Sequence, residues 1–411
     1  GQIYQSGVNK YRNYVMYNQM VIEQDLPFVR GLKLKGVIAY DLKPIHKKIW
    51  KTPMPYYTVD MSSGSPEYVQ AGSDGPEKPT YTQNYSENQS LTLQGQIQYN
   101  NTFGKHEVGG LVVFEMRNTQ GDSFEASILN YNVNIPELNN GSSDPADIKN
   151  SGNSSKTKQR SIIYRVNYAY DGKYLFETSA RYDGSYYFAP DHRFGFFPSA
   201  SIGWRISEEN FLKGRFNWLS NLKLRASYGE SGALAADPFQ YLSSYNLYSN
   251  SAVLNGKPTQ GLSELLEPNK YITWEKARKM DIGFDLGLLN NQISFSIDYF
   301  SEYRSNMLVK PQVTVPFEYG IGIAQENKGK MKNRGIEFSL NASNQFTKDF
   351  SAGLQVNFTY AKNKIVEIFE TPATYNNPYR RQTGRPLGQK FGYKALGYFQ
   401  LSDDLNGNGI I

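Results

Sequence analysis

Residues 161–182 read SIIYRVNYAYDGKYLFETSARY, and this stretch decides the fold class. On both sides of Asp171-Gly172, large apolar side chains occupy alternate positions, and most of the positions between them are polar. Because successive side chains of a strand point to opposite faces, the stretch predicts two strands, each with an apolar and a polar face. Asp-Gly accepts the positive φ of a two-residue turn, so we expect the two strands to form a hairpin.

The same period-two pattern recurs along the chain and predicts about a dozen strands of roughly nine to eleven residues, the length a tilted strand needs to cross a bilayer. Examples of the apolar faces are Leu91, Leu93, Ile97 and Tyr99; Val108, Val112, Phe114 and Met116; Met280, Ile282, Phe284 and Leu286; and Leu354, Val356, Phe358 and Tyr360. Alternation alone does not tell which face lies inside, since a soluble barrel or sandwich buries its apolar face.

The predicted connections differ in length and add a second argument. The short ones are Asn101–Lys105, Asp171-Gly172, Asn290-Asn291 and Asn344–Asp349, and the long polar ones are Asn118–Lys158, Glu230–Lys270 and Asn363–Leu387. Short turns at one rim and long loops at the other are typical of outer-membrane barrels, and 32 Tyr and 23 Phe suit their aromatic girdles. The sequence therefore predicts an all-β fold, an antiparallel transmembrane β-barrel, with soluble all-β architectures as the remaining alternative.

Composition excludes several other classes. No run of about eighteen apolar residues occurs, which excludes a helical membrane protein. The chain has no cysteine, so disulfides and thiolate metal sites are excluded. The net charge of +6 is small for 411 residues and its Lys and Arg residues are scattered, so we expect no nucleic-acid partner.

Several motifs carry a family resemblance. They are Arg181-Tyr182-Asp183-Gly184-Ser185, RFGFFPSASIGWRISEE at 193–209, NLKLRASYG at 221–229, KNRGIE at 332–337, and Gly384-Arg385-Pro386 followed by Phe391-Gly392-Tyr393. Together they resemble the SusC/RagA-type TonB-dependent transporters of Gram-negative outer membranes, over most of the chain. We expect most of these residues to serve the architecture, with Gly335 allowing close approach within the sheet and Trp204 anchoring the membrane interface.

The resemblance implies a barrel of 22 strands around an amino-terminal plug. We expect residues 1–411 to be a barrel region with long extracellular loops, a fragment of a larger chain whose plug and carboxy-terminal strands lie outside it. Closure of the barrel would then depend on strands outside this chain, because an open sheet edge is not tolerated in hydrocarbon. The resemblance also implies a SusD-like surface lipoprotein as a lid, TonB acting through the plug, and an oligosaccharide or peptide as cargo.

Catalysis has no candidate residues. His46, His106 and His192 are the only histidines and are widely spaced, without a metal-ligand pattern such as His-Glu-x-x-His. No nucleophile elbow and no phosphate loop occur. We therefore expect no enzymatic activity and no required cofactor.

One motif suggests a metal ion. Asp404, Asn406 and Asn408, followed by Gly409, match the first half of a calcium loop, in which oxygens at alternate positions converge on one ion. The three residues are candidate calcium ligands in an extracellular loop. Asn-Gly segments also form simple turns, which is the alternative reading.

Tyr186, Tyr187 and Phe188 form the candidate substrate-binding cluster, because aromatic rings stack on sugars and pack on apolar peptide side chains. Packing within the loop or within the girdle is the favoured alternative.

Three functions remain after this reading. The leading one is TonB-dependent active import of a bulky nutrient across the outer membrane, with the lipid bilayer and a surface lipoprotein as partners. The alternative is an adhesive or structural outer-membrane barrel without transport. The third is a soluble carbohydrate-binding or hydrolytic all-β protein.

Overall fold

The computed structural model describes residues 7–62, 64–311, 316–395, 397–398 and 400. Regular structure in this part is almost entirely antiparallel β-sheet, as predicted. The strands form two compact units, Gly1–Arg215 with Asp237–Phe239, and Phe216–Ala236 with Gln240–Ile411.

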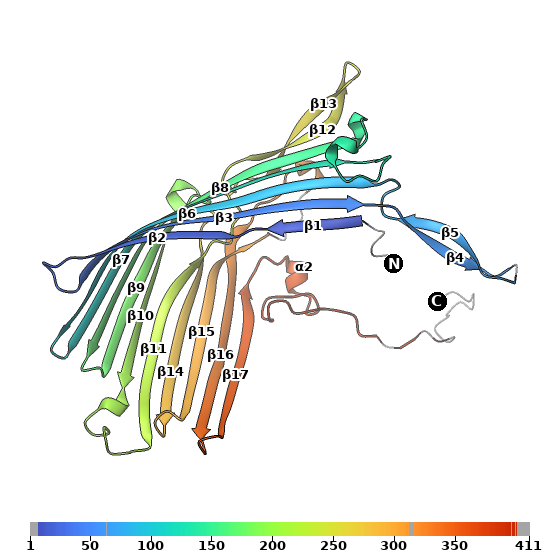
Figure 1. Cartoon of the computed structure of the whole chain (residues 1–411). Helices are drawn as coiled ribbons and strands as arrows, with labels where there is room; N and C mark the ends of the chain where they lie inside the picture. The colour runs from blue at the N-terminus through green and yellow to red at the C-terminus, as the bar shows by residue number, and fades with distance from the viewer. Residues whose placement is uncertain (1–6, 63, 312–315, 396, 399, 401–411) are drawn as a thin grey trace. The chain divides into compact units, whose positions relative to one another are not determined.

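The first unit contains one sheet in which β1 and β2 both pair with β3, and β6 to β10 follow in chain order (Figure 1). The hairpin of β4 and β5 is inserted between β3 and β6. The bounds are β1 Gly7–Asn13, β2 Met16–Asp25, β3 Leu32–Lys51, β4 Met54–Asp60, β5 Glu67–Asp74, β6 Thr80–Phe103, β7 His106–Ile128, β8 Ile148–Tyr170, β9 Tyr174–Ser185 and β10 Phe194–Arg205. Short 3₁₀ turns are η1 Leu138–Asn140, η2 Pro145–Asp147, η3 Pro190–His192 and η4 Ile206–Glu208.

Pro44 explains why two strands lie end to end along β3. The backbone N–H of Tyr14 donates to the carbonyl oxygen of Pro44 at 3.1 Å, so the backbone polar groups of Pro44 face β1 and β2. Proline has no N–H to return the bond. The ladder is therefore interrupted at this point, between the end of β1 at Asn13 and the start of β2 at Met16.

The second unit contains a sheet in the order β11, β14, β15, β16 and β17, with the separate hairpin of β12 and β13 between β11 and β14 in the chain. The bounds are β11 Leu219–Ala233, β12 Ser244–Leu254, β13 Lys257–Leu266, β14 Glu275–Leu288, β15 Ile293–Val309, β16 Glu326–Gln345, β17 Ser351–Glu367, η5 Phe317–Tyr319 and α2 Pro372–Tyr375. Within the described residues, no helix is long and apolar enough to cross a membrane.

Several strands are much longer than predicted. β6 has 24 residues and β7 and β8 have 23 each, against about nine to eleven expected from bilayer thickness. The predicted long loop Asn118–Lys158 is wrong for most of its length, because β7 and β8 stay paired from Asn118 and Lys158 to Ile128 and Ile148. The backbone ladder forms there in spite of a composition rich in Asn, Ser and Gly, because the context of the sheet outweighs weak strand propensity.

Three other predicted connections agree more closely with the structure. Asp171 and Gly172 have φ of 53° and 63°, as the predicted hairpin turn requires. The segment Glu230–Lys270 is long but contains the hairpin of β12 and β13, and Asn363–Leu387 includes the end of β17 and the short helix α2.

A cluster of buried aromatic residues lies at one end of β3 and β6. Trp50, Tyr81 and Tyr131 form one cluster, in which the rings of Trp50 and Tyr131 meet edge to face at 4.9 Å between centroids. The hydroxyl of Tyr131 donates to the carbonyl oxygen of Glu137 at 3.1 Å. The cluster therefore fastens the loop after β7 onto β3 and β6.

Candidate functional site

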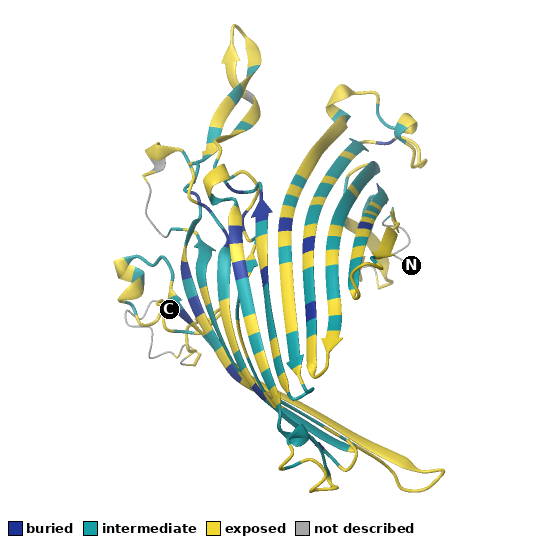
Figure 2. Cartoon of the chain, turned by 90° about the vertical axis from the view of Figure 1, so that its left-hand side faces the viewer, coloured by how far each residue is buried: buried dark blue, intermediate teal, exposed yellow. Residues whose placement is uncertain are grey.

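The predicted apolar faces of the strands are exposed. Phe114 of β7 is 51% exposed, Ile202 of β10 is 61% exposed and Phe358 of β17 is 50% exposed. Exposed and less exposed segments alternate along the strands (Figure 2). A water-soluble sheet buries its apolar face, whereas a membrane barrel turns it to lipid. In each unit the exposed apolar face therefore has the character of a lipid-facing surface.

Aromatic side chains bracket this face on β9. Tyr174 and Tyr182 are eight residues apart, or about 26 Å along the strand, which at the ~40° tilt of such strands spans roughly 20 Å of the ~25 Å apolar band. The ring of Tyr174 stacks on Trp204, with centroids 6.5 Å apart, and Tyr182 stacks on Phe194 at 5.0 Å. The indole N–H of Trp204 donates to Oε1 of Glu209 at 3.0 Å. Trp204 thus has an apolar body and a polar contact, the geometry expected of an interfacial anchor.

Ion pairs lie at the short turns beyond these rings. Nζ of Lys105, in the turn after β6, lies 3.0 Å from Oδ2 of Asp171, and Nζ of Lys173 lies 3.5 Å from the same atom. The hydrogen bond from Lys105 holds the pKa of Asp171 below its ordinary value. Glu209 accepts hydrogen bonds from the Tyr174 hydroxyl and from Trp204, and these lower the pKa of its carboxyl. Both acids are therefore held in the charged form at this rim.

The opposite face of the first unit carries a connected row of polar side chains. The side-chain amide of Gln98 donates to Gln96 at 2.9 Å, that of Gln96 donates to Gln94 at 2.9 Å, and that of Gln94 donates to Oε2 of Glu115 at 2.6 Å. The four side chains project from the same face of β6 and β7. Such a face suits a wet lumen, where it offers donors and acceptors to water and to a passing polar solute.

In the second unit the same kind of face is organised by one arginine. Arg225 of β11 contacts Asp281 at 3.3 Å, Asp285 at 3.1 Å and Asp298 at 2.7 Å, so one guanidinium joins β11, β14 and β15. The planar five-donor group of arginine is suited to several carboxylates at once. The cluster therefore ties three neighbouring strands together on their polar face.

Gly283 makes this geometry possible. It lies directly between Arg225 and Asp298 in the strand register. A Cβ at this position would lie 2.4 Å from Oδ1 of Asp298 and 2.5 Å from Cζ of Arg225. A side chain here would displace the ends of the Arg225 and Asp298 side chains, because the arginine crosses β14 over the space that it would fill.

Comparison with known proteins identifies the family. Residues 37–409 match a family model described as "TonB dependent receptor-like, beta-barrel". The chain belongs to this family. The predicted SusC/RagA-type resemblance and the fold class of an antiparallel transmembrane barrel are confirmed, and the protein lies in the bacterial outer membrane.

Two curated members of the TonB-dependent receptor family illustrate the match. The chain is 30% identical to TonB-dependent receptor P26 of Formosa agariphila, over 85% of this chain and 35% of the relative. It is 32% identical to TonB-dependent receptor SusC of Bacteroides thetaiotaomicron, over 61% of this chain and 27% of the relative. The chain thus spans about a third of the length of the curated relatives it matches.

A solved structure agrees with the fold. The structure of the RagAB peptide transporter superposes with a TM-score of 0.73 at 22% identity, over 92% of this chain and 40% of that chain. At this identity the likeness shows the fold of this TonB-dependent receptor barrel and not its cargo.

The predicted substrate cluster sits in the loop after β9 of the barrel. Phe188 is fully buried, and the ring of Tyr186 packs edge to face against Tyr187 at 5.9 Å and against Phe239 at 5.0 Å. These contacts agree with the packing alternative. Ligand contact by Tyr186, Tyr187 and Phe188 stays a prediction.

The predicted calcium ligands Asp404, Asn406 and Asn408 lie outside the described residues and also stay a prediction. Among the residues that are described, no group of three or more His, Asp or Glu side chains is arranged to hold a metal ion.

Reasoning from sequence missed the cluster around Arg225. A signal was present, since Asp281 and Asp285 are four residues apart and therefore share one face of a strand, and Arg225 shares the polar face of its own strand. Only the register, which no single sequence states, brings the three strands into contact.

Proposed function

We propose that the whole protein is a TonB-dependent importer that takes up a bulky nutrient, an oligosaccharide or a peptide, with a SusD-like surface lipoprotein as its lid. The observation that carries the proposal is the pairing of the two faces: an exposed apolar face toward lipid and a connected polar face, in a family of TonB-dependent receptors. A lumen lined with amides and carboxylates is suited to a hydrated cargo.

The relatives support the choice of cargo class and partners. One curated relative is SusC, and one of the solved structures that match is that of a peptide transporter, RagAB. The energy for import would come through TonB, acting on a plug. Both the lid and TonB are partners of the whole protein.

The first test is purification of the whole protein from its native membrane in detergent, with mass spectrometry of the copurified molecules. We expect a surface lipoprotein with bound oligosaccharide or peptide. Uptake of the recovered ligand by whole cells should then stop when TonB is deleted and return when TonB is restored.

The alternative is an adhesive or structural barrel. A barrel recovered without lid or ligand, from cells whose uptake is unaffected by TonB deletion, would contradict the importer and support the alternative. Uptake of the ligand that continues without TonB would instead indicate a passive pore.

A further inference from the structure

Two glycines lie side by side in the interior of the apolar face of the first unit. Gly36 of β3 pairs with Gly95 of β6, and the same row continues to Ile22 of β2 on one side and Phe114 of β7 on the other. Both glycines share the face of the exposed apolar side chains, since Leu34, Ile38 and Ile97 lie two residues from them. In this row the backbone of Gly36 and Gly95 is bare and forms the floor of a depression, and the side chains of Ile22 and Phe114 form its two walls.

Nothing in the described structure requires glycine at these two positions. Neither residue has a positive φ. A Cβ added to either one would meet no atom within 4 Å. Glycine weakens the interior of a strand, so its presence at two paired positions needs another reason.

Two other interior glycines, Gly335 and Gly283, show the contrast. A Cβ at Gly335 would lie 2.3 Å from the carbonyl oxygen of Tyr360 and 2.6 Å from the ring of Phe300, which bears out the predicted close approach. At Gly283 it would collide with the arginine cluster. In these places the chain itself fills the space that glycine leaves, whereas the space over Gly36 and Gly95 is left open.

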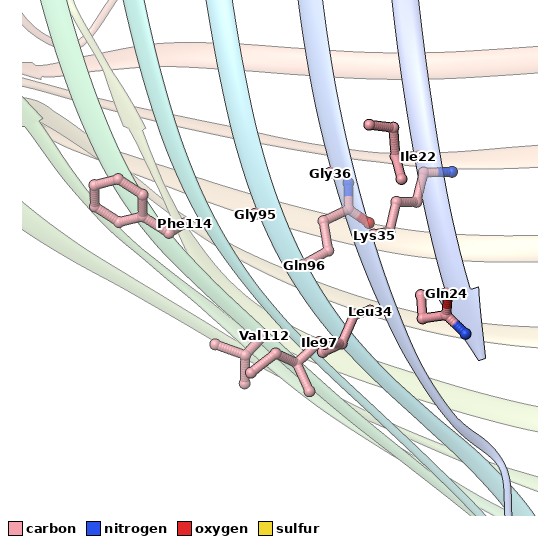
Figure 3. A pocket seen from close by; sticks show the side chains of 10 residues that line it. All are labelled: Ile22, Gln24, Leu34, Lys35, Gly36, Gly95, Gln96, Ile97, Val112 and Phe114. Carbon is pink, nitrogen blue, oxygen red and sulfur yellow. The ribbon is translucent and has the colours of Figure 1, made fainter. Parts of the chain in front are cut away.

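The open space is an apolar hollow. It has a volume of ≈ 570 Å³ and is lined by Ile22, Leu34, Ile97, Val112 and Phe114 around the two glycines, and Gln24, Lys35 and Gln96 complete the lining. Figure 3 shows the bare ribbon of both glycines between the side chains of Ile22 and Phe114. A second hollow of ≈ 320 Å³ shares Ile22, Phe114 and both glycines, and extends the depression along the strands toward Ile38 and Met116.

We propose that this hollow, the Gly36–Gly95 groove, is a binding site for one acyl chain of an outer-membrane lipid. The groove is continuous with the exposed apolar face that this barrel turns to the bilayer, so hydrocarbon is what covers it. From Leu93 to Ile97 it follows about 13 Å of strand, enough for an extended stretch of acyl chain.

Van der Waals packing explains why an acyl chain would occupy the groove in preference to the rest of the apolar face. All of the apolar face is in contact with hydrocarbon, so burial from water contributes nothing to the choice of one place over another. An unfilled hollow would lose dispersion contacts with both walls and the floor, and a flexible acyl chain can restore them. The groove therefore orders one chain that exchanges more slowly than its neighbours on the flat parts of the same face.

The test is photo-crosslinking of the whole protein in vesicles of phosphatidylethanolamine and phosphatidylglycerol that contain phosphatidylethanolamine with a diazirine in its acyl chain. Labelled residues are located by mass spectrometry. Phe114 and Phe358 are matched reporters, because both are phenylalanines on the apolar face and are 51% and 50% exposed. We expect about fivefold more label at Phe114 than at Phe358, the ratio that roughly 1 kcal/mol of extra packing gives.

Filling the groove should abolish the difference. The double variant Gly36→Val, Gly95→Val places side chains in the open space and should reduce label at Phe114 to the level at Phe358. The control is Gly110→Val on β7, because Gly110 also has open space for a Cβ but lies between Tyr99 and Val166 rather than beside a second glycine. This control should leave the label at Phe114 unchanged.

A second variant, in a residue that lines the groove, keeps the test valid if the double variant does not assemble. Ile22→Ala leaves both glycines in place and should also lower the label at Phe114, because the chain loses one wall of the groove. Equal label at Phe114 and Phe358 in the unaltered protein would overturn the proposal. It would also be overturned if the excess label persisted with the groove filled, or if filling it changed the oligomeric state, which would make a second copy the occupant.

Discussion

Strand β8 has two regions that share a continuous hydrogen-bond ladder but differ in the polarity of their side chains. Residues 162–170 alternate, with Ile162, Tyr164 and Val166 exposed on the apolar face. Residues 148–161 carry Asn, Ser, Gly and Lys on both faces and yet pair with β7 through to Ile148. The comparison shows that backbone pairing determines how far the strand extends, whereas the side-chain pattern indicates whether lipid or water surrounds each face.

The second region of β8 and the neighbouring ends of β6 and β7 form what we call the polar extension, which consists of residues 80–90 of β6, 117–128 of β7 and 148–161 of β8. Water suits both of its faces, whereas residues 162–170 suit hydrocarbon on one face and water on the other. We infer that the barrel wall rises out of the bilayer on the side away from the short turns. The ends of β6 to β8 are thus available to the lid and the cargo that we propose.

The largest effect should come from placing a charge in each region on the same face of β8. Val166→Arg puts a cation midway along the apolar segment and should cost about 2–4 kcal/mol of stability. Ser154→Arg, twelve residues away on the same face, should cost no more than about 0.5 kcal/mol. Folded fractions, measured by the heat-modifiable gel mobility of the reconstituted protein, compare the two. Equal losses would show that the two regions share one environment.

Removing the contact that holds the loop 129–147 should lower the local stability of the polar extension and leave that of residues 162–170 unchanged. Tyr131→Ala removes a buried ring from its contact with Trp50 and should cost about 3 kcal/mol locally. We expect faster amide exchange in residues 129–147 and in the extension, and unchanged exchange in residues 162–170. The control Phe124→Ala removes an exposed ring and should change neither region. Loss of protection in residues 162–170 would contradict the independence of the two regions.

A smaller effect should distinguish the polar face from the apolar face. Gly283→Ala places a methyl group against the ends of the Arg225 and Asp298 side chains, which must shift and weaken their ion pair, and should destabilise the barrel by about 1 kcal/mol. Gly110→Ala adds the same methyl to open space on the apolar face and should be neutral to within about 0.5 kcal/mol. Denaturant midpoints of the two variants measure the difference, and a larger loss for Gly110→Ala would refute this account of the arginine cluster.

The smallest effect concerns the turn at the opposite end of β8. Lys105 lowers the pKa of Asp171 below its ordinary value of 3.8, so the pair contributes stability above that pH and loses it as the pH falls through the lower, folded value. Unfolding midpoints measured from pH 6 to pH 3 should therefore fall less in Asp171→Asn than in the unaltered protein. Asparagine tolerates the positive φ at this turn, so the substitution changes the charge without straining the backbone. Parallel pH curves would argue against the pair.

The regularity of the membrane segment made it readable from sequence. Alternation such as Tyr164, Val166 and Tyr168 follows from the pleat alone, and Asp171-Gly172 follows from the φ that the turn demands. The sequence predicts a loop over 118–158 because Asn, Ser and Gly have weak strand propensity, and only the neighbouring ladder overrides it in residues 118–128 and 148–158.

The contacts on the polar face were harder to predict from the sequence. Arg225 meets Asp298 across 73 residues of chain, and the meeting depends on the register and on the bare backbone of Gly283 between them. The open groove over Gly36 and Gly95 was equally hidden, because a glycine letter in a strand does not tell whether neighbours fill its space.

The central claim is that the exposed apolar face lies in lipid while the polar extension of the same strand lies in water. The chain contains no cysteine, so Val166→Cys and Ser154→Cys each give one site within it for a spin label. Collision with oxygen, which concentrates in the bilayer, and with a water-soluble nickel chelate is measured in the reconstituted whole protein. We predict that the label at 166 meets oxygen and is shielded from nickel, and that the label at 154 shows the reverse. Free access of nickel to both labels would contradict the account.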